Sequence, residues 1–168
     1  LRQLRMRWDD FDLRPQLQSS IVFPGCKLQF TNDFELLFSQ IRGVFPDQTD
    51  GFRKLLRRID DHDALNLERS SESARKVVSG YVSDPVLVDM LFCPLMFYGS
   101  ATPHDMDFNQ FVIMFKSIFY EGFGRPFEGI RVILKKLVRH FKSLGGTLKL
   151  RAGVKEIVQR NGRASSVV

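Results

Sequence analysis

The most regular pattern of hydrophobic and polar positions lies in the last third of the chain. Between Gly129 and Leu144, apolar residues recur at steps of three and four, with charged residues between them. This spacing places the apolar side chains on one face of an α-helix. We therefore predict an amphipathic helix from Gly129 or Ile130 to Leu144, ended by Gly145 and Gly146. Its apolar positions are Ile130, Ile133, Leu134, Leu137, Val138, Phe141 and Leu144.

Further helices are predicted upstream from capping residues and from the same kind of spacing. Asn32 followed by Glu35 has the pattern of a capping box, and Asp84-Pro85 places a cap before a proline at the first helical position. Cys93-Pro94 is expected to interrupt the helix that starts there. The most apolar segment, residues 107–119, is expected to be buried. The predicted helices span residues 33–42, 50–67, 72–78, 86–91 and 107–119.

Short β-prone runs near both ends of the chain predict β-hairpins. Pro24-Gly25 and Asn161-Gly162 stand between such runs, and both pairs are typical of tight turns. The predicted strands span residues 20–23, 27–30, 147–150, 154–159 and 164–168. The pattern as a whole indicates an α+β fold, with a mostly helical body and short β-hairpins at both ends.

The composition fits a folded domain and narrows the classes of partner. Of the 168 residues 43% are hydrophobic, and the formal net charge of +6 is spread along the chain. Because no recognised module accompanies that charge, we expect no nucleic-acid partner. Cys26 and Cys93 stand far apart without a CxxC pair, which excludes a zinc ribbon and favours a reducing, intracellular compartment. The chain starts at Leu1 and ends inside a predicted strand, so we expect it to be a fragment of a longer protein.

The candidate chemical motifs are few. Residues 121–130, EGFGRPFEGI, carry three glycines before a helix but match neither GxGxxG nor GxxxxGK[ST], so a tightly packed turn is preferred over a phosphate loop. His62 lies in the run DDHD, which we interpret as a solvated acidic patch, because consecutive helical residues diverge and cannot converge on one ion. We therefore expect no metal site and identify no catalytic residue.

The predicted helix of residues 129–144 also has a basic face. Two interpretations stay open: an ordinary solvated face, or contact with anionic lipid headgroups. The second would make the chain a non-enzymatic helical interaction or membrane-surface module. The basic residues are Arg131, Lys135, Lys136, Arg139 and Lys142.

Several motifs follow one another in an order that resembles a known family. From about residue 20 to its end, the chain resembles FAD-dependent oxidoreductases of the phytoene desaturase and retinol saturase type, within the amine-oxidase flavoprotein superfamily. The motifs are VFPG (22–25), FP (45–46), SDPVL (83–87), RPFEG (125–129), GGTLKL (145–150), VKEI (154–157) and NGRA (161–164).

The resemblance implies a Rossmann-like FAD domain with a substrate domain inserted into it. On this basis residues 1–144 are expected to form part of the substrate domain, and residues 145–168 the strands that return to the FAD-binding domain. The family's V-x-x-I valine, which contacts the FAD adenine through its backbone, corresponds to Val154. A family glycine near the flavin ring corresponds to Gly129, and Glu128 stands where the family has the glycine before it.

The resemblance also implies the cofactor and the partners. The full-length protein would bind FAD, whereas this chain, without the flanking flavin segments, should hold none tightly. The substrate would be a lipophilic polyene or a related apolar molecule, such as a carotenoid or retinol, and residues 107–119 could wall its tunnel. Peripheral membrane contact is expected, as is self-association through the exposed strand edges of residues 147–168.

Overall fold

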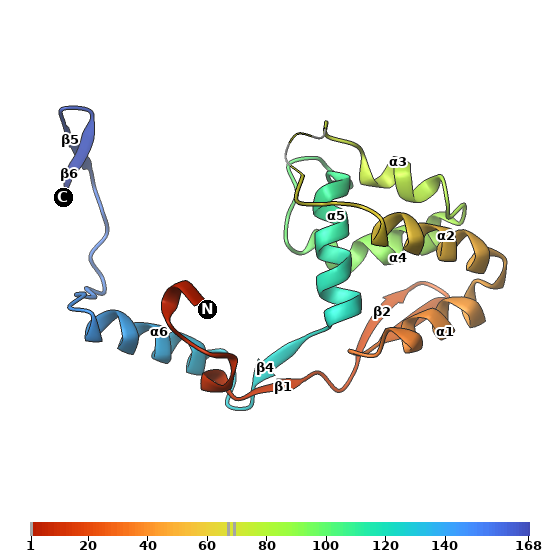
Figure 1. Cartoon of the computed structure of the whole chain (residues 1–168), viewed down its shortest axis with the longest axis horizontal. Helices are drawn as coiled ribbons and strands as arrows, with labels where there is room; N and C mark the ends of the chain where they lie inside the picture. Colours follow the sequence, from red (N-terminus) through yellow and green to blue (C-terminus); the bar gives the residue numbers. More distant parts are fainter. Residues whose placement is uncertain (1, 67, 69) are drawn as a thin grey trace. The chain divides into compact units, whose positions relative to one another are not determined.

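The computed structural model describes every residue except 1, 67 and 69 and divides the chain into two compact units (Figure 1). The core unit is the continuous segment Asp12–Arg125, and the flanking unit combines Leu1–Phe11 with Pro126–Val168. The sequence predicted a domain boundary between residues 144 and 145, whereas the contacts divide the chain after Phe11 and after Arg125. What each part does stays a prediction.

The core unit contains a β-hairpin that packs on its hydrophobic core. β2 (Ser19–Phe23) and β3 (Cys26–Phe30) are antiparallel, and Ile21 and Leu28 oppose each other on the buried face. Gly25 has the φ of +78° that a two-residue turn of this kind requires. The predicted hairpin is confirmed, with each strand one residue longer than expected.

Most helices of the core unit begin after a polar residue that caps them. The capping side chains accept hydrogen bonds from backbone N–H groups of the first turn. The caps are Asp33 for α1 (Phe34–Val44), Ser73 for α3 (Ala74–Ser79), Asp84 for α4 (Pro85–Met96) and Asp107 for α5 (Phe108–Phe115). The other helices are the 3-10 helix η3 (Pro46–Gln48), α2 (Thr49–Asp60) and the π-helix η4 (Lys116–Glu121), which continues α5.

Phenylalanine rings on α5 form the centre of the core. Phe111 is fully buried, and its ring centroid lies 5.0 Å from that of Phe92 on α4 and 5.9 Å from that of Phe108. These separations are typical of favourable aromatic pairs. Contacts of α5 with α3 and α4, and of α4 with β2, join the helices and the hairpin around this core. The expected burial of residues 107–119 is therefore confirmed for most of its apolar side chains.

The two ends of the core unit lie together. β1 (Leu13–Pro15) pairs with β4 (Gly124–Pro126), and the N–H of Gln16 donates to the carbonyl of Phe123 at 2.9 Å. The segments that enter and leave the core unit are thus joined by backbone hydrogen bonds, as in a domain inserted into another chain segment.

The flanking unit has little core of its own. It contains η1 (Arg2–Leu4), η2 (Trp8–Phe11), α6 (Arg131–Ser143) and the antiparallel hairpin of β5 (Ile157–Arg160) and β6 (Arg163–Val167). Among the residues of this unit whose side chains are described, only Phe11 and Pro126 are buried. The amphipathic helix and the turn at Asn161-Gly162 are confirmed as predicted.

Some predicted boundaries are wrong. The cap of α1 is Asp33 rather than Asn32, and α1 continues through Gly43 to Val44. Residues 147–150 form no strand. The α+β class holds, because the body is helical and antiparallel strand pairs lie near both ends.

Two helix ends also differ from the predictions. α2 ends at Asp60 with Asp61 as its C-cap, whereas the prediction placed the end at Leu67, which lies outside the described residues. α4 passes through Pro94 and ends at Met96, because the complete burial of Leu91 and Leu95 around the proline outweighs one missing hydrogen bond. In the described part of the chain, no helix has the length and apolarity needed to cross a membrane.

Candidate functional site

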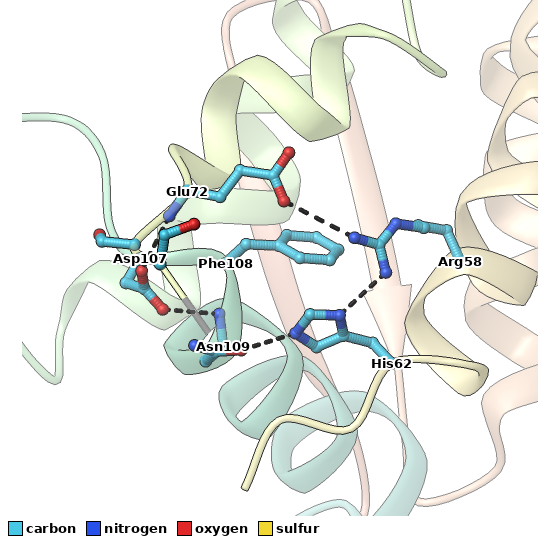
Figure 2. A pocket seen from close by; sticks show the side chains of 8 residues that line it. Arg58, His62, Glu72, Asp107, Phe108 and Asn109 are labelled. Carbon is cyan, nitrogen blue, oxygen red and sulfur yellow. Dashed lines mark hydrogen bonds and ion pairs between the residues drawn. The ribbon is translucent and has the colours of Figure 1, made fainter. Parts of the chain in front are cut away.

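A polar pocket opens where α2, the segment before α3 and the start of α5 meet (Figure 2). Its volume is about 470 Å³. The lining residues are Arg58, His62, Ser70, Ser71, Glu72, Asp107, Phe108 and Asn109.

His62 is the buried polar residue of this pocket, with 7% of its surface exposed. Its Nδ1 lies 2.9 Å from a guanidinium nitrogen of Arg58, and its Nε2 lies 2.6 Å from Oδ1 of Asn109. Arginine can only donate, so Nδ1 accepts, and the proton on Nε2 is donated to Asn109. The interpretation of His62 as part of a solvated acidic patch is therefore wrong. Arg58 lies only four residues before His62, whereas Asn109 is 47 residues away in the sequence, and no local pattern reveals that contact.

Arg58 links three parts of the pocket. Figure 2 shows its guanidinium facing both the His62 ring and the Glu72 carboxylate, which is 3.6 Å away. The guanidinium carbon also lies 4.8 Å from the centroid of the Phe108 ring, a cation–π arrangement. Because the carboxylate of Glu72 is half exposed, its attraction to Arg58 is screened by water.

Asp105 ties the start of α3 to the loop before α5. Its carboxylate accepts hydrogen bonds from the Ser73 hydroxyl at 2.6 Å and from the N–H of Arg75 at 2.9 Å. Burial by itself raises the pKa of Asp105, but these hydrogen bonds, another from the N–H of Met106, and the charge of Arg75 outweigh it. The pKa consequently lies below its ordinary value of 3.8.

Asp107 caps α5 and also holds the segment before α3. It accepts hydrogen bonds from the N–H of Asn109 at 2.8 Å and from the N–H of Glu72 at 3.1 Å. Burial raises the pKa of Asp107, but the hydrogen bonds from the Ser71 side chain and from these backbone groups outweigh it. The pKa of Asp107 is therefore also below 3.8.

The polar pocket acts as a structural junction. Arg58, His62 and Asn109 are bonded to one another, and the two aspartates serve as hydrogen-bond acceptors for backbone and hydroxyl groups. Within the described ranges, no group of three or more His, Cys, Asp and Glu side chains could hold a metal ion. The pocket thus joins α2, α3 and α5 and contains no arrangement that we can assign to a reaction.

A second concave surface, the apolar groove, lies between β2 and the end of α4, and its volume is about 390 Å³. No residue of the segment 107–119 lines it, because the large side chains of that segment pack in the core instead. The lining residues are Ser19, Ser20, Ile21, Val22, Phe30, Cys93, Pro94, Phe97, Tyr98 and Phe123.

Asn32 fixes the Phe123 wall of this groove. Its side-chain amide donates to the carbonyl of Phe123 at 3.1 Å, and its Oδ1 accepts from the N–H of Phe123 at 3.0 Å. The preceding residue, Gly122, has φ +77° and ψ −167°, a conformation almost restricted to glycine, and a Cβ there would overlap the Asn32 side chain. The tight packing expected for the glycines of EGFGRPFEGI is thus found at Gly122, but residues 124–126 form the strand β4, which was not predicted.

The two residues that the resemblance assigns to FAD lie in the flanking unit. Gly129 has φ +88° just before α6, and no heavy atom lies within 4 Å of the place where a Cβ would stand, so the position is open to close approach. Val154 is 61% exposed and precedes β5 without belonging to a strand. The assignment of Val154 to FAD stays a prediction. Among the described residues, no backbone hydrogen bond links Gly129 to Val154.

Sequence reasoning missed Asn32 as a clamp and the aromatic rim of the groove. The partner of Asn32 is 91 residues away in the sequence, and no local pattern signals such a contact. The sequence does contain one signal for the rim of the groove, the aromatic pair Phe97-Tyr98 between a helix and Gly99. In the structure both side chains are exposed directly after α4.

Comparison of the chain with family models, with characterised proteins and with solved structures gives no significant match.

Proposed function

We propose that this chain is the substrate domain, with adjoining segments, of an FAD-dependent oxidoreductase that acts on a lipophilic polyene or a related apolar molecule. The observation that supports this most is the inserted arrangement of the core unit. The continuous segment Asp12–Arg125 begins and ends in paired strands, whereas the flanking unit combines residues from both sides of it. The motif resemblance also implies a substrate domain inserted into a flavin domain, with the boundary placed at residues 144 and 145.

The exposed apolar side chains of the flanking unit also support the proposal. α6 buries none of its residues, and Leu134 and Phe141 on it are 55% and 48% exposed. In the C-terminal hairpin, Ile157 and Val167 are 59% and 63% exposed. An amphipathic helix and a hairpin with uncovered apolar side chains are stabilised when another layer of structure covers them. The rest of a flavin domain would provide that layer.

The proposed roles of individual residues follow from the resemblance and fit the local geometry. The backbone of Val154 would contact the FAD adenine, and the open position at Gly129 would allow the flavin to approach the chain. Flavin, when bound, supplies the redox chemistry. The chain's own residues would bind and orient an apolar substrate and exclude water.

The proposal is tested on the protein encoded by the complete reading frame that contains these residues. We expect that protein to purify yellow, with FAD released on denaturation and identified by chromatography. We expect the 168-residue chain alone to lose added FAD on desalting. A full-length protein that is colourless and takes up no FAD would refute the proposal.

A membrane-surface module is the second candidate, and the composition of α6 favours it. Arg131–Ser143 contains no acidic residue, and its basic face accompanies exposed apolar side chains. Such a helix can lie in a membrane interface that contains anionic lipid. Sedimentation of the chain with anionic but not with neutral vesicles, lost in Lys135→Glu/Arg139→Glu, would support this candidate. No sedimentation with either kind of vesicle would exclude it.

A further inference from the structure

We infer that the apolar groove of the core unit binds a neutral, elongated lipophilic molecule, whose apolar chain lies between β2 and the end of α4. Ser20 and Val22 of β2 form one wall, and Cys93 and Phe97 at the end of α4 form the other. Phe30 lines the groove although only 3% of it is exposed, so the groove reaches the hydrophobic core. Its volume of about 390 Å³ lies within the range of small-molecule sites, roughly 300–1,000 Å³.

The charge of the lining selects the class of ligand. None of the ten lining residues is charged. A charged group inside the groove would lose its hydration without gaining an ionic partner, which is strongly unfavourable. A hydroxyl or carbonyl end, by contrast, can bond to the exposed Ser20 at the rim. The ligand is therefore neutral, with at most a small polar end.

The apolar side chains at the rim of the groove are exposed, which indicates that a ligand covers them. Val22 is 69% exposed, Phe97 is 86% exposed and Tyr98 is 60% exposed, and all three surround one concave surface. Large apolar side chains gathered around a cavity, unlike scattered ones, are typical of binding sites. A ligand chain in the groove would remove these side chains from water.

The far wall of the groove is already fixed before any ligand binds. The main chain of Phe123 is held by both polar groups of the Asn32 side chain, and its ring lies 6.1 Å from that of Phe30. A pre-formed wall lowers the entropy cost of binding. Asn32 is therefore a positioning residue for the groove.

The inference rests on the proposed function only for the ligand's role as a substrate, since the binding itself needs no flavin. Labelling of Cys93 by N-ethylmaleimide in the 168-residue chain measures the binding, with 1-decanol as the probe and peptide mapping to separate the two cysteines. A bound chain shields Cys93 by a factor of 1 + [L]/Kd, so labelling slows about tenfold at a ninefold excess of decanol over its Kd. Cys26, which does not line the groove and whose thiol faces Met90 at 3.5 Å, should be labelled at an unchanged rate.

Two exposed positions provide matched variants. Val22→Asp places a charge on the groove wall and should abolish the protection of Cys93. Leu17→Asp, at a position that is 95% exposed and outside the groove, should leave the protection intact. The inference is overturned if decanol does not slow labelling of Cys93, if both cysteines change together, or if the protection survives Val22→Asp. If Cys93 of the 168-residue chain is not protected while the full-length protein retains FAD, only the groove is refuted. If Cys93 is protected while the full-length protein takes up no FAD, only the proposed function is refuted.

Discussion

The two antiparallel hairpins in the described part of the chain both have a glycine with positive φ in the turn and differ in what lies beneath them. Gly25 in the first turn has φ +78°, and Gly162 in the second has φ +72°. Under the first hairpin, Ile21 and Leu28 are 5% and 0% exposed, whereas in the second Ile157 is 59% exposed. The local sequence thus determines a hairpin in both places, but only the first is stabilised by packing.

The same contrast separates the core unit from the flanking unit as wholes. α5 and α6 both have the hydrophobic spacing of helices that pack on a neighbour. α5 buries Phe111 and Phe115 completely, and α6 buries nothing. Helical stability in proteins comes mainly from such packing rather than from propensity. We therefore expect the core unit to unfold cooperatively and the flanking unit to be stabilised by whatever covers α6 and the second hairpin.

The largest effect is expected from truncating a core ring. Phe111→Ala should lower the free energy of unfolding of the core unit by about 3–5 kcal/mol, because a buried phenyl leaves a cavity among Phe92, Phe108 and Phe115. Phe141→Ala on α6, where the side chain is 48% exposed, should cost less than about 1 kcal/mol. Urea denaturation followed by tyrosine fluorescence measures this, since all three tyrosines lie in the core unit. Equal losses in the two variants would refute the contrast between the units.

The next largest effect is expected at the Phe123 wall. Gly122→Ala should destabilise the core unit by roughly 2–4 kcal/mol, because an unfavourable backbone conformation is combined with overlap against Asn32. Gly129→Ala, also at positive φ but in open space, should cost only about 1–2 kcal/mol locally and leave the core transition in place. The same denaturation experiment compares the two variants. A Gly122→Ala protein as stable as the wild type would show that the Asn32 clamp is not formed.

Acid should destabilise the core unit and so reduce the difference in stability between the two units. The pKa values of Asp105 and Asp107 in the folded chain lie below 3.8, so both carboxylates stabilise the core unit above pH 3.8. This stabilisation is lost as the pH falls through the folded values. Asp107→Asn should therefore destabilise the core unit by about 1–2 kcal/mol at pH 7, and the difference from the wild type should shrink below pH 3.8.

The control for this experiment is the variant Asp50→Asn, because the side chain of Asp50 is 85% exposed. It should leave the urea midpoint nearly unchanged at both pH values. A constant difference between wild type and Asp107→Asn from pH 7 to pH 3 would contradict the lowered pKa of Asp107.

The sequence predicted what depends on neighbours along the chain. The cap Asp84, the turn at Asn161-Gly162 and the spacing of α6 are local, and each was predicted correctly. The early end of α2 was not predicted. The helical pattern of the sequence continues past Asp60 into residues that, in the fold, place His62 against Asn109.

The candidate sites depended more on distant contacts. The apolar groove combines β2, the end of α4 and Phe123, and no single segment carries its signature. The buried state of His62 requires Arg58 and Asn109, which come from two helices. A run such as DDHD reads as solvated when only its own residues are considered, and the structure is needed to show which neighbour removes the water.

The smallest expected effect tests the comparison between the two hairpins most directly. Gly25→Ala and Gly162→Ala impose the same kind of strain, because both glycines have positive φ and neither has a heavy atom within 4 Å of the added Cβ. Each change should cost about 1–2 kcal/mol in its own turn. Since the first hairpin packs on the core, Gly25→Ala should shift the tyrosine-detected unfolding of the core unit. Gly162→Ala should leave that transition unchanged and only speed amide exchange in β5 and β6. If both variants shift the core transition equally, the second hairpin is coupled to the core unit, and the two hairpins do not differ as their burial indicates.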